Sequence, residues 1–271
     1  LGEAEAVERS LVAFTLANLC GVSVPEGPDF GARLEAALAK AGPGERVVTA
    51  FSSHMPGACL NSACRDRAGV APCEAACPFH ALINGPKGNE IAQEACVDCG
   101  RCVEACPEGF LQDKVEYLPA TQLLKGGRPV IAAVAPAIAG QFGEGASIEK
   151  MRTAFKLLGY ADMVEVAFFA DMLTMKEAGE FDEHILHKDD FLISSCCCPM
   201  WVAMLRKVYA GLVRHVSPSV SPMIAAGRVL KILRPDCAVV FVGPCIAKKS
   251  EAKEADLLGA IDHVFTFQEI R

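Results

Sequence analysis

The feature that most constrains this chain is a run of four cysteines near residue 100, spaced C-x2-C-x2-C-x3-C and followed by proline. The four are Cys96, Cys99, Cys102 and Cys106. Three thiolates spaced in this way can surround one face of a four-iron cubane, while the fourth reaches toward a second cluster. A structural zinc site is the alternative, but zinc sites favour two separated cysteine pairs. The spacing therefore predicts iron–sulfur ligation and electron transfer.

An imperfect repeat of this pattern lies upstream, where CEAACP at 73–78 echoes CVEACP at 102–107. In ferredoxins with two clusters, the cysteine before the proline of each half ligates the cluster of the other half. The predicted ligand sets of the two 4Fe–4S clusters are Cys59, Cys64, Cys73 and Cys106 for one, and Cys96, Cys99, Cys102 and Cys77 for the other. The first half is irregularly spaced, so zinc is a stronger alternative there than in the second half.

Amino-acid composition and charge indicate the cellular location of the protein and exclude some classes of partner. The 14 cysteines are clustered at metal-binding spacings rather than scattered as in a disulfide framework, which predicts a reducing, cytoplasmic location. A net charge of −7 gives no electrostatic reason to expect nucleic acid as a partner. No apolar run approaches the roughly 20 residues of a membrane helix, and no export signal is visible at the N-terminus. We therefore expect neither nucleic acid nor a membrane as a partner.

The pattern of apolar residues divides the chain into three regions. We expect an N-terminal helical segment over 1–45, a ferredoxin-like two-cluster domain over 46–127, and an α/β region over 128–271. The strands predicted in the last region are Val130–Val134, Met163–Ala167, Phe191–Ser194, Ala238–Val242 and Val264–Phe267. Amphipathic helices are predicted between them, with apolar stripes over 151–158, 201–212 and 229–233. The predicted fold is a small α+β domain followed by a parallel β-sheet covered by helices on both faces.

Two further groups of reactive residues follow predicted strands. One is SSCCCPMW at 194–201 and the other is GPCIAKKSE at 243–251. Three adjacent cysteines cannot all face one metal, so at least one thiol is left free to carry a proton. Cys245 lies at a strand-to-helix turn, where backbone N–H groups favour a thiolate. Lys248, one turn further, is suited to hold an anionic ligand, and Glu251 follows it by another turn.

These two segments resemble the first and second active-site loops of the FeFe (di-iron) hydrogenases, whose usual forms are TSCCPxW and MPCxxKxxE. The segments VAPAIAGQFGE and FFADMLTMKEAGEF also match that family, and the similarity covers nearly the whole chain. The resemblance implies an H-cluster, which is a 4Fe–4S cubane joined through a cysteine to a di-iron unit with CO and CN ligands. It implies that Cys198 and Cys245 ligate the cubane, that Cys197 passes protons, that Lys248 hydrogen-bonds a cyanide, and that Glu180, Ser217 and Glu177 form the proton path.

The resemblance also implies an activity, the reversible oxidation of H2 to protons and electrons. The electrons would pass through the 4Fe–4S clusters to a ferredoxin or a similar soluble carrier, and maturation machinery would supply the di-iron unit. Two departures from the family pattern matter. The first loop has three cysteines instead of two, and in the alternative register Cys196 is the proton carrier. The third loop, with the remaining cubane cysteines, would lie beyond Arg271, so residues 1–271 would hold one of the two lobes around the H-cluster.

Other interpretations of the same residues remain open. A hydrogenase-like iron–sulfur assembly factor without a di-iron unit is one alternative, although it would not need Lys248 or a spare thiol. A sensor of H2 that does not turn it over is another. His184 and His187 have a spacing that metal sites use, but their charged surroundings favour a solvated segment. Without the resemblance, Glu177 and Glu180 would be interpreted as surface carboxylates.

Overall fold

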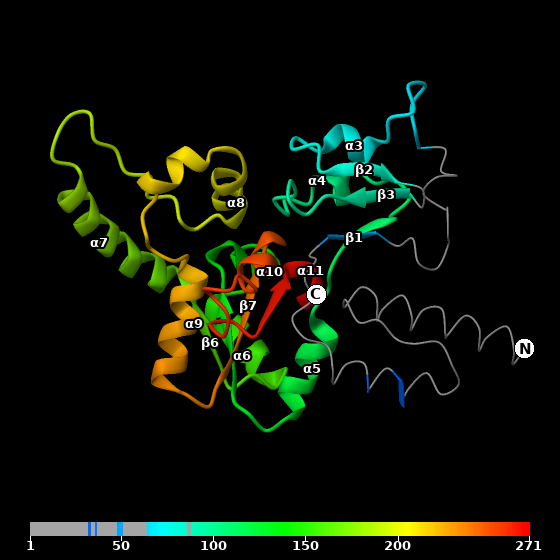
Figure 1. Ribbon diagram of the computed structural model, residues 1–271. Helices are drawn as coiled ribbons and strands as arrows, with labels where there is room; N and C mark the ends of the chain where they lie inside the picture. Colours follow the sequence, from blue (N-terminus) through cyan, green and yellow to red (C-terminus); the bar gives the residue numbers. More distant parts are fainter. Residues whose placement is uncertain (1–31, 34–35, 37–47, 51–63, 86–87) are drawn as a thin grey trace, which may run out of the picture. The chain divides into compact units, whose positions relative to one another are not determined.

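The computed structural model describes residues 32–33, 36, 48–50, 64–85 and 88–271. The chain forms two compact units that divide between Pro119 and Ala120 (Figure 1). Most of the predicted N-terminal helical segment and the predicted cluster ligand Cys59 lie outside the described residues.

Between residues 48 and 113, the described part of the first unit contains two short antiparallel strand pairs and two short helices. Strand β1 (Val48–Ala50) pairs with β4 (Leu111–Asp113), and β2 (Leu82–Gly85) forms a hairpin with β3 (Gly88–Ile91). Helices α3 (Pro72–Ala76) and α4 (Arg101–Glu104) pack against each other. This arrangement is the small α+β domain that the sequence predicted.

The two halves of the sequence repeat have the same local structure. Each short helix carries the third cysteine of its half, Cys73 in α3 and Cys102 in α4. The cysteine of each Cys-Pro pair follows the end of its helix, because the proline after it cannot continue a helix without losing a hydrogen bond. The repeat therefore places equivalent cysteines at equivalent positions in the two halves.

The second unit is built on a parallel sheet with the strand order β6-β5-β7-β8. Its strands are β5 (Val130–Val134), β6 (Asp162–Glu165), β7 (Ala238–Gly243) and β8 (His263–Thr266). Every residue of the two central strands, β5 and β7, is buried. Their sequences, VIAAV and AVVFVG, are continuous apolar runs because helices cover both faces of such a sheet.

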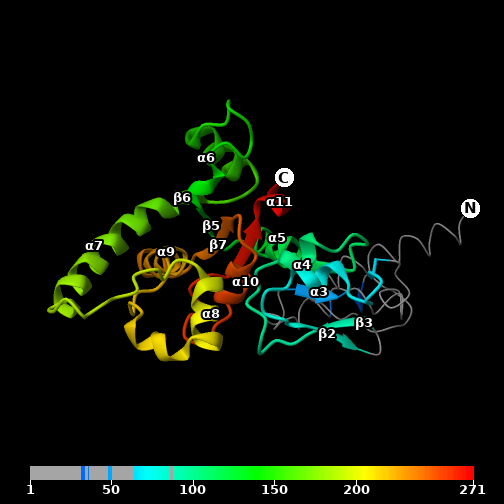
Figure 2. The same ribbon diagram turned by 90° about the horizontal axis from the view of Figure 1, so that it is seen from above.

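The helices cover opposite faces because the strand order reverses direction after β6. The crossover from β5 to β6 contains α6 (Ile148–Leu157), and the crossover back to β7 contains α9 (Pro222–Leu233). Right-handed crossovers in opposite directions place their helices on opposite faces, and Figure 2 shows α6 and α9 on either side of the strands. The predicted α/β fold with a parallel sheet flanked by helices is confirmed.

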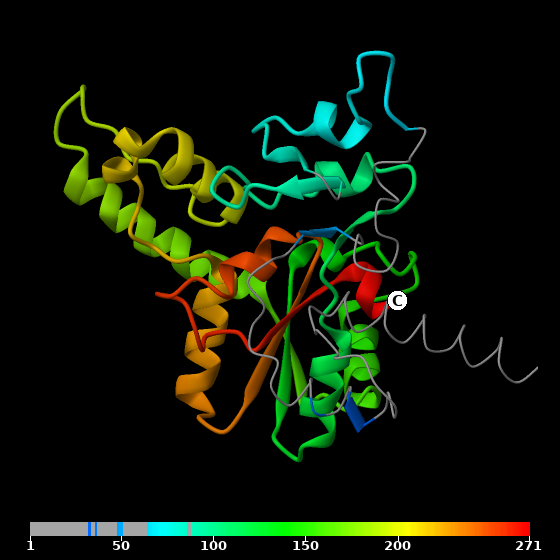
Figure 3. The ribbon, with the colours of Figure 1, turned by 45° about the vertical axis from the view of Figure 1, so that its right-hand side comes forward.

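The remaining elements position the candidate site. Between β6 and α9 the chain leaves the sheet along α7 (Val166–His184) and returns through α8 (Pro199–Val208) and the 3-10 helix η2 (Ala210–His215) (Figure 3). The other short elements are α5 (Tyr117–Lys125), η1 (Pro136–Ile138), α10 (Ala247–Glu251) and α11 (Phe267–Ile270). None of the described helices combines the length and the hydrophobicity that crossing a membrane requires.

The predicted strand at Phe191–Ser194 is wrong. Only Ile193 pairs with another backbone segment, through an isolated bridge to Val216. Phe191 is half exposed and stacks on the ring of His215, with ring centroids 4.1 Å apart. A short apolar run becomes a strand only beside a strand edge with free backbone groups, and this segment lies in the excursion away from the sheet. The cysteines at 196–198 therefore do not follow a strand of the sheet.

The strand expected over Val264–Phe267 ends at Thr266, because the helix α11 begins at Phe267. Two further predicted boundaries also differ. The strand expected over Met163–Ala167 ends at Glu165, because α7 begins directly at Val166. The apolar stripe over 201–212 is divided between α8, which ends at Val208, and η2. Both differences arise because short apolar runs fit a helix as well as a strand, and tertiary packing decides between them.

Candidate functional site

In the first unit, four cysteines surround one cavity. Its lining contains Cys77, Cys96, Cys99 and Cys102 together with apolar residues, among them Phe79, Leu82 and Ile91. These are the four ligands that the sequence assigned to one cluster, including Cys77 from the other half of the repeat. An apolar cavity with four thiols is chemically suited to a 4Fe–4S cluster, since thiolates are the ligands that such clusters use.

Backbone N–H groups around this cavity donate to two of the four sulfur atoms. The N–H of Ala81 donates to Cys77 Sγ at 3.3 Å, and the N–H of Asp98 donates to Cys96 Sγ at 3.4 Å. Asp98 and Gly100 have positive φ angles of 54° and 76°, which curl the ligand loop. Burial, and then the neighbouring Cys96 and Cys99, raise the pKa of the Cys102 thiol to about 12. Four thiolates this close need the positive charge of iron to be ionised together.

The other predicted ligand set is also gathered in the first unit. Cys73 is buried in an apolar cluster with Ala71 and Leu111, and Cys64 and Cys106 pack against the same cluster. Three of the four predicted ligands therefore lie together, and the fourth, Cys59, is outside the described residues. Within the described part of the chain, no group of three or more His, Cys, Asp or Glu side chains could hold a single metal ion.

In the second unit, the three adjacent cysteines lie in three different environments. The Cys196 thiol donates to Glu177 Oε1 at 3.1 Å and to the carbonyl of Val220 at 3.4 Å. Cys197 is exposed. Cys198 is the N-cap residue of α8, with Pro199 at the first helical position, and its thiol makes no capping hydrogen bond.

The structure thus brings Cys196, rather than Cys197, into contact with Glu177. A turn closed by a hydrogen bond from Cys196 N to Ser194 O, 2.9 Å, positions the first cysteine of the three. Burial, together with the hydrogen bond to Glu177 and its charge, raises the pKa of the Cys196 thiol to about 12. Cys196 is therefore a neutral donor within hydrogen-bond reach of an acceptor carboxylate, which is the geometry that proton transfer requires, while its raised pKa means that the resting thiol keeps its proton.

A buried lysine joins the two cysteine-containing segments of this unit. Lys248, in α10, donates to the carbonyl of Cys197 at 2.8 Å and to Glu251 Oε2 at 2.6 Å. Lys248 and Glu251 are 9% and 7% exposed, so this pair is not the solvated surface pair that its sequence alone would suggest. Cys245 lies in the turn between β7 and α10. The last residue of β7, Gly243, leaves no room for a side chain, because an added Cβ would be 2.5 Å from the Phe241 ring.

The side chains around this contact could bind an anionic iron–sulfur group. They are Cys198, Trp201, Cys245 and Lys248. Cys198 and Cys245 offer sulfur ligands, and Lys248 offers a buried ammonium group. The indole N–H of Trp201, in the first turn of α8, is buried and has no hydrogen-bond partner in the described part of the chain. A buried donor without an acceptor is costly, and a cluster sulfide is one acceptor that would satisfy it. Sequence analysis included this tryptophan in the motif at 194–201 but assigned it no role.

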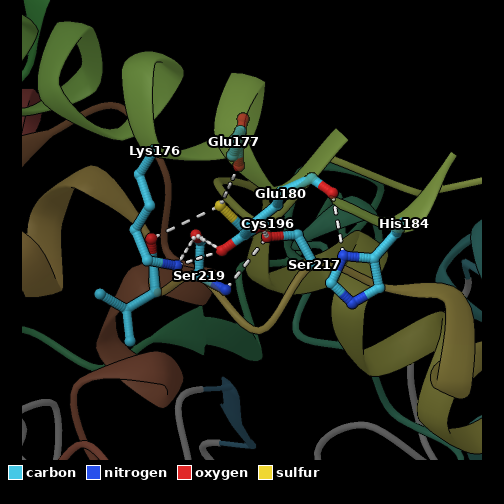
Figure 4. A network of polar contacts seen from close by, with 8 residues as sticks. Lys176, Glu177, Glu180, His184, Cys196, Ser217 and Ser219 are labelled. Carbon is cyan, nitrogen blue, oxygen red and sulfur yellow. Dashed lines mark hydrogen bonds and ion pairs between the residues drawn. The ribbon is translucent and has the colours of Figure 1, made fainter. Parts of the chain in front are cut away.

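Glu180 and Ser217 are brought together in a separate polar network, shown in Figure 4. The Ser217 hydroxyl donates to Glu180 Oε2 at 2.5 Å, and the Ser219 hydroxyl donates to Oε1 at 3.0 Å. The Lys176 ammonium contacts Glu180 Oε1 and donates to Ser219 Oγ at 2.7 Å. Within the described residues, no hydrogen bond joins this network to the Cys196–Glu177 pair.

The predicted metal alternative at His184 and His187 finds no support in these contacts. His184 Nδ1 lies 2.9 Å from the backbone carbonyl of Glu180, and both histidines are exposed. Lys176 and Ser219 were missed by sequence analysis. A lysine on an exposed helix ordinarily contacts only water, and its partner Ser219 is 43 residues away in the chain.

Comparison with known proteins gives two family matches. Residues 128–271 match the family described as "Iron only hydrogenase large subunit, C-terminal domain", and residues 67–117 match "LdpA Fe-S cluster-binding domain". The first match contains all of the candidate site residues of the second unit. The second match contains the four cysteines that line the cavity of the first unit.

Curated relatives carry related names. The chain is 31% identical over 196 residues to "NADP-reducing hydrogenase subunit HndD" of Solidesulfovibrio fructosivorans, covering 64% of this chain and 33% of that protein. It is 32% identical over 160 residues to "Iron hydrogenase 1" of Clostridium pasteurianum, covering 52% and 28%. It is also 32% identical over 90 residues to "Cytosolic Fe-S cluster assembly factor NAR1 homolog" of Schizosaccharomyces japonicus, covering 29% and 18%. The chain thus spans about a third of the length of the two hydrogenases it matches.

Proposed function

Because the chain belongs to the iron-only hydrogenase large-subunit family, we propose that it takes part in the reversible oxidation of H2 to protons and electrons. The observation that carries this proposal is the contact from the buried Lys248 to the carbonyl of Cys197. It brings the segment that contains Cys245 against the segment that contains Cys198, although the two lie far apart in the sequence. Two thiolates and one buried cation therefore come from two loops that the family model covers.

In this proposal Cys198 and Cys245 would ligate the H-cluster cubane. The Lys248 ammonium would hydrogen-bond an anionic ligand of the di-iron unit, since it is buried and held in place by Glu251. The H-cluster, when bound, supplies the chemistry that breaks and forms the H–H bond. The task of the chain is to hold this group, exclude water and move protons.

The proton-carrying thiol in this proposal is Cys196, with Cys197 as the alternative. The support is the 3.1 Å contact from the Cys196 thiol to Glu177. Glu177 accepts the thiol proton, and Glu180 with Ser217 would continue the path outward. Because no hydrogen bond joins the two pairs in the described residues, a water molecule or a side-chain rotation would complete the path.

The first unit would supply electrons through two 4Fe–4S clusters. One would be held by the four cysteines around the cavity and the other by Cys64, Cys73 and Cys106 together with Cys59. The partners proposed from this arrangement are a ferredoxin or a similar soluble carrier and the machinery that supplies the di-iron unit. The cysteine usage supports a reducing, cytoplasmic setting.

A second candidate function follows from the match to a protein named as an iron–sulfur assembly factor. An assembly factor would bind iron–sulfur clusters at this site without converting H2. A sensor of H2 would likewise not turn it over rapidly. The contacts of Cys196 with Glu177 and of Lys248 with Cys197 favour the enzyme, because cluster storage needs neither a proton-transferring thiol nor a buried cation.

The proposal is tested by loading the full-length protein anaerobically with the di-iron cofactor and recording the infrared bands of its CO and CN ligands. We expect these bands in the wild type and in Lys125→Met, which changes an exposed lysine of α5. We expect weak or shifted CN bands in Lys248→Met and in Lys248→Met/Glu251→Gln, the second of which avoids a buried unpaired carboxylate. Absence of the bands from a wild type that holds all of its iron–sulfur clusters would contradict the proposal.

A further inference from the structure

The carboxylate of Glu180 is held by three donors from two parts of the second unit. Ser217 and Ser219 donate from the segment between η2 and α9, and Lys176 donates from one turn earlier on α7. Lys176 also bonds to Ser219, so the lysine ties α7 to that segment (Figure 4). The inner oxygen, Oε2, faces Ser217, and the outer oxygen, Oε1, faces Lys176 and Ser219.

Exposure to solvent changes steeply across this network. Ser217 is 4% exposed and Glu180 is 8% exposed, whereas the side chain of Lys176 is 53% exposed. Ser219 is intermediate. Among the partners that the structure gives to the Glu180 carboxylate, Lys176 is thus the one that bulk water reaches most easily. Lys176 therefore covers the carboxylate oxygen, Oε1, on the side where the network is most exposed to water.

The charges around Glu180 favour its ionised form. Desolvation alone would raise its pKa, but the hydrogen bonds from Lys176, Ser217 and Ser219 outweigh it and leave the pKa of Glu180 below its usual range. The facing groups from the neighbouring segment are the neutral hydroxyls of Ser217 and Ser219. On α7 itself, the His184 ring contacts the Glu180 carbonyl rather than its carboxylate. Lys176 is therefore the one cation among the contacts that this carboxylate makes in the described residues.

We propose that Lys176 is a gating residue, which controls the exchange of protons between the Glu180 carboxylate and bulk water. While the ammonium covers Oε1, the carboxylate stays ionised. When the half-exposed lysine side chain swings into solvent, a proton from water can add to Oε1. This step converts the carboxylate and a hydronium ion into a carboxylic acid and a water molecule, and no electron is transferred. The Ser217 hydroxyl keeps its own proton in its hydrogen bond to Oε2.

The effect of this gate on turnover rests on the function proposed above, but the contact itself can be tested without it. The probe is a carbon-13 NMR titration of the Glu180 carboxyl in the full-length protein without di-iron cofactor, assigned by comparison with Glu180→Gln. We expect Lys176→Met to raise the pKa of Glu180 by about one unit, as the loss of an adjacent opposite charge does. Lys176→Arg should keep the wild-type value, and so should Lys188→Met, which changes an exposed lysine outside the network.

The second measurement is the pH dependence of H2 production by the cofactor-loaded protein. A relay through Glu180 requires the carboxylate to bind a proton, and a higher pKa allows this at higher pH. The alkaline limb of the profile should therefore move upward by about one unit in Lys176→Met and stay in place in Lys176→Arg and Lys188→Met.

The outcomes separate this inference from the proposed function. An unchanged Glu180 titration in Lys176→Met would overturn the inference. A shifted titration with an unchanged pH profile would also overturn it, because the gate would then not control the proton path. A shifted titration in a protein whose loaded wild type makes no H2 would support control of Glu180 by Lys176 and contradict the proposed function instead.

Discussion

At the scale of single residues, the three adjacent cysteines at 196–198 differ in their contacts and exposure, and therefore in the roles they could have. Cys196 is partly buried and contacts Glu177, Cys197 is exposed, and Cys198 is the N-cap residue of α8. Consecutive side chains point in different directions, so one backbone segment gives three thiols three environments. Our account assigns proton transfer to the first thiol and cluster ligation to the third.

The residue-scale prediction compares Cys196→Ala with Cys197→Ala in the loaded protein. Removing the thiol that contacts Glu177 should lower H2 production by about 10²-fold or more, the usual loss when a positioned proton donor is removed. Cys197→Ala should keep most of the activity, and both variants should keep their iron content. A silent Cys196→Ala with an inactive Cys197→Ala would show that the register implied by the family motif is the correct one.

At the scale of elements, close approaches of backbone position the helices on the sheet. Gly227 in α9 lies against the chain near β8, and an added Cβ would be 2.2 Å from the carbonyl oxygen of Ala260. Because that neighbour is backbone, it cannot rotate away as a side chain could. α9 packs on both β5 and β7, so a shift of this helix would disturb the centre of the sheet.

Gly227→Ala should lower the free energy of unfolding by about 1–3 kcal/mol, the usual cost of overpacking a core. Gly179→Ala on α7 is the matched control, since an added Cβ there meets nothing within 4 Å. The control should be neutral or stabilising by up to about 1 kcal/mol, because alanine is a better helix former. Thermal and denaturant unfolding measure both, and an equal effect of the two changes would refute this packing argument.

A second prediction at this scale concerns the buried pair between α10 and α11. Lys249 is 0% exposed and donates to Glu269 Oε2 at 2.8 Å, and Glu269 also forms a capping box with Thr266. Lys249→Met should cost about 3–5 kcal/mol, because it removes a buried cation that donates to a buried carboxylate. Lys249→Met/Glu269→Gln should recover much of this loss in denaturant unfolding. If the double variant were as unstable as the single one, charge burial would not be the cause.

Prediction from the sequence succeeded for the two central strands, whose residues are all buried. The runs at β5 and β7 are continuous and apolar, and both predictions held. The run at 191–194 was misread because periodicity cannot show whether a strand edge is nearby. Among site residues, the cysteine spacing foresaw Cys77 beside the cysteines of the other half. Lys176 and Ser219 were not foreseeable, because their contact depends on how α7 packs against a segment 43 residues away.

At the scale of the whole molecule, the chain combines a cysteine-rich unit with a unit of the hydrogenase family. Iron and sulfide analysis tests the first. Anaerobically purified protein that carries the two ferredoxin-type clusters, before any H-cluster is assembled, should hold about eight iron and eight sulfide per chain from those clusters. A value near four with one equivalent of zinc would instead place zinc in the irregular half that contains Cys64 and Cys73.

The measurement that tests the central claim most directly is isotope exchange between D2 and water, because it needs H2 activation and a proton path but no electron carrier. The full-length protein, loaded anaerobically with the di-iron cofactor, is placed under D2 in ordinary water, and HD and H2 are followed by mass spectrometry. We predict steady formation of HD and H2 by the wild type and its loss in Cys196→Ala. No exchange by a wild type that holds its iron–sulfur clusters and shows the CO and CN bands of the di-iron unit would contradict the account.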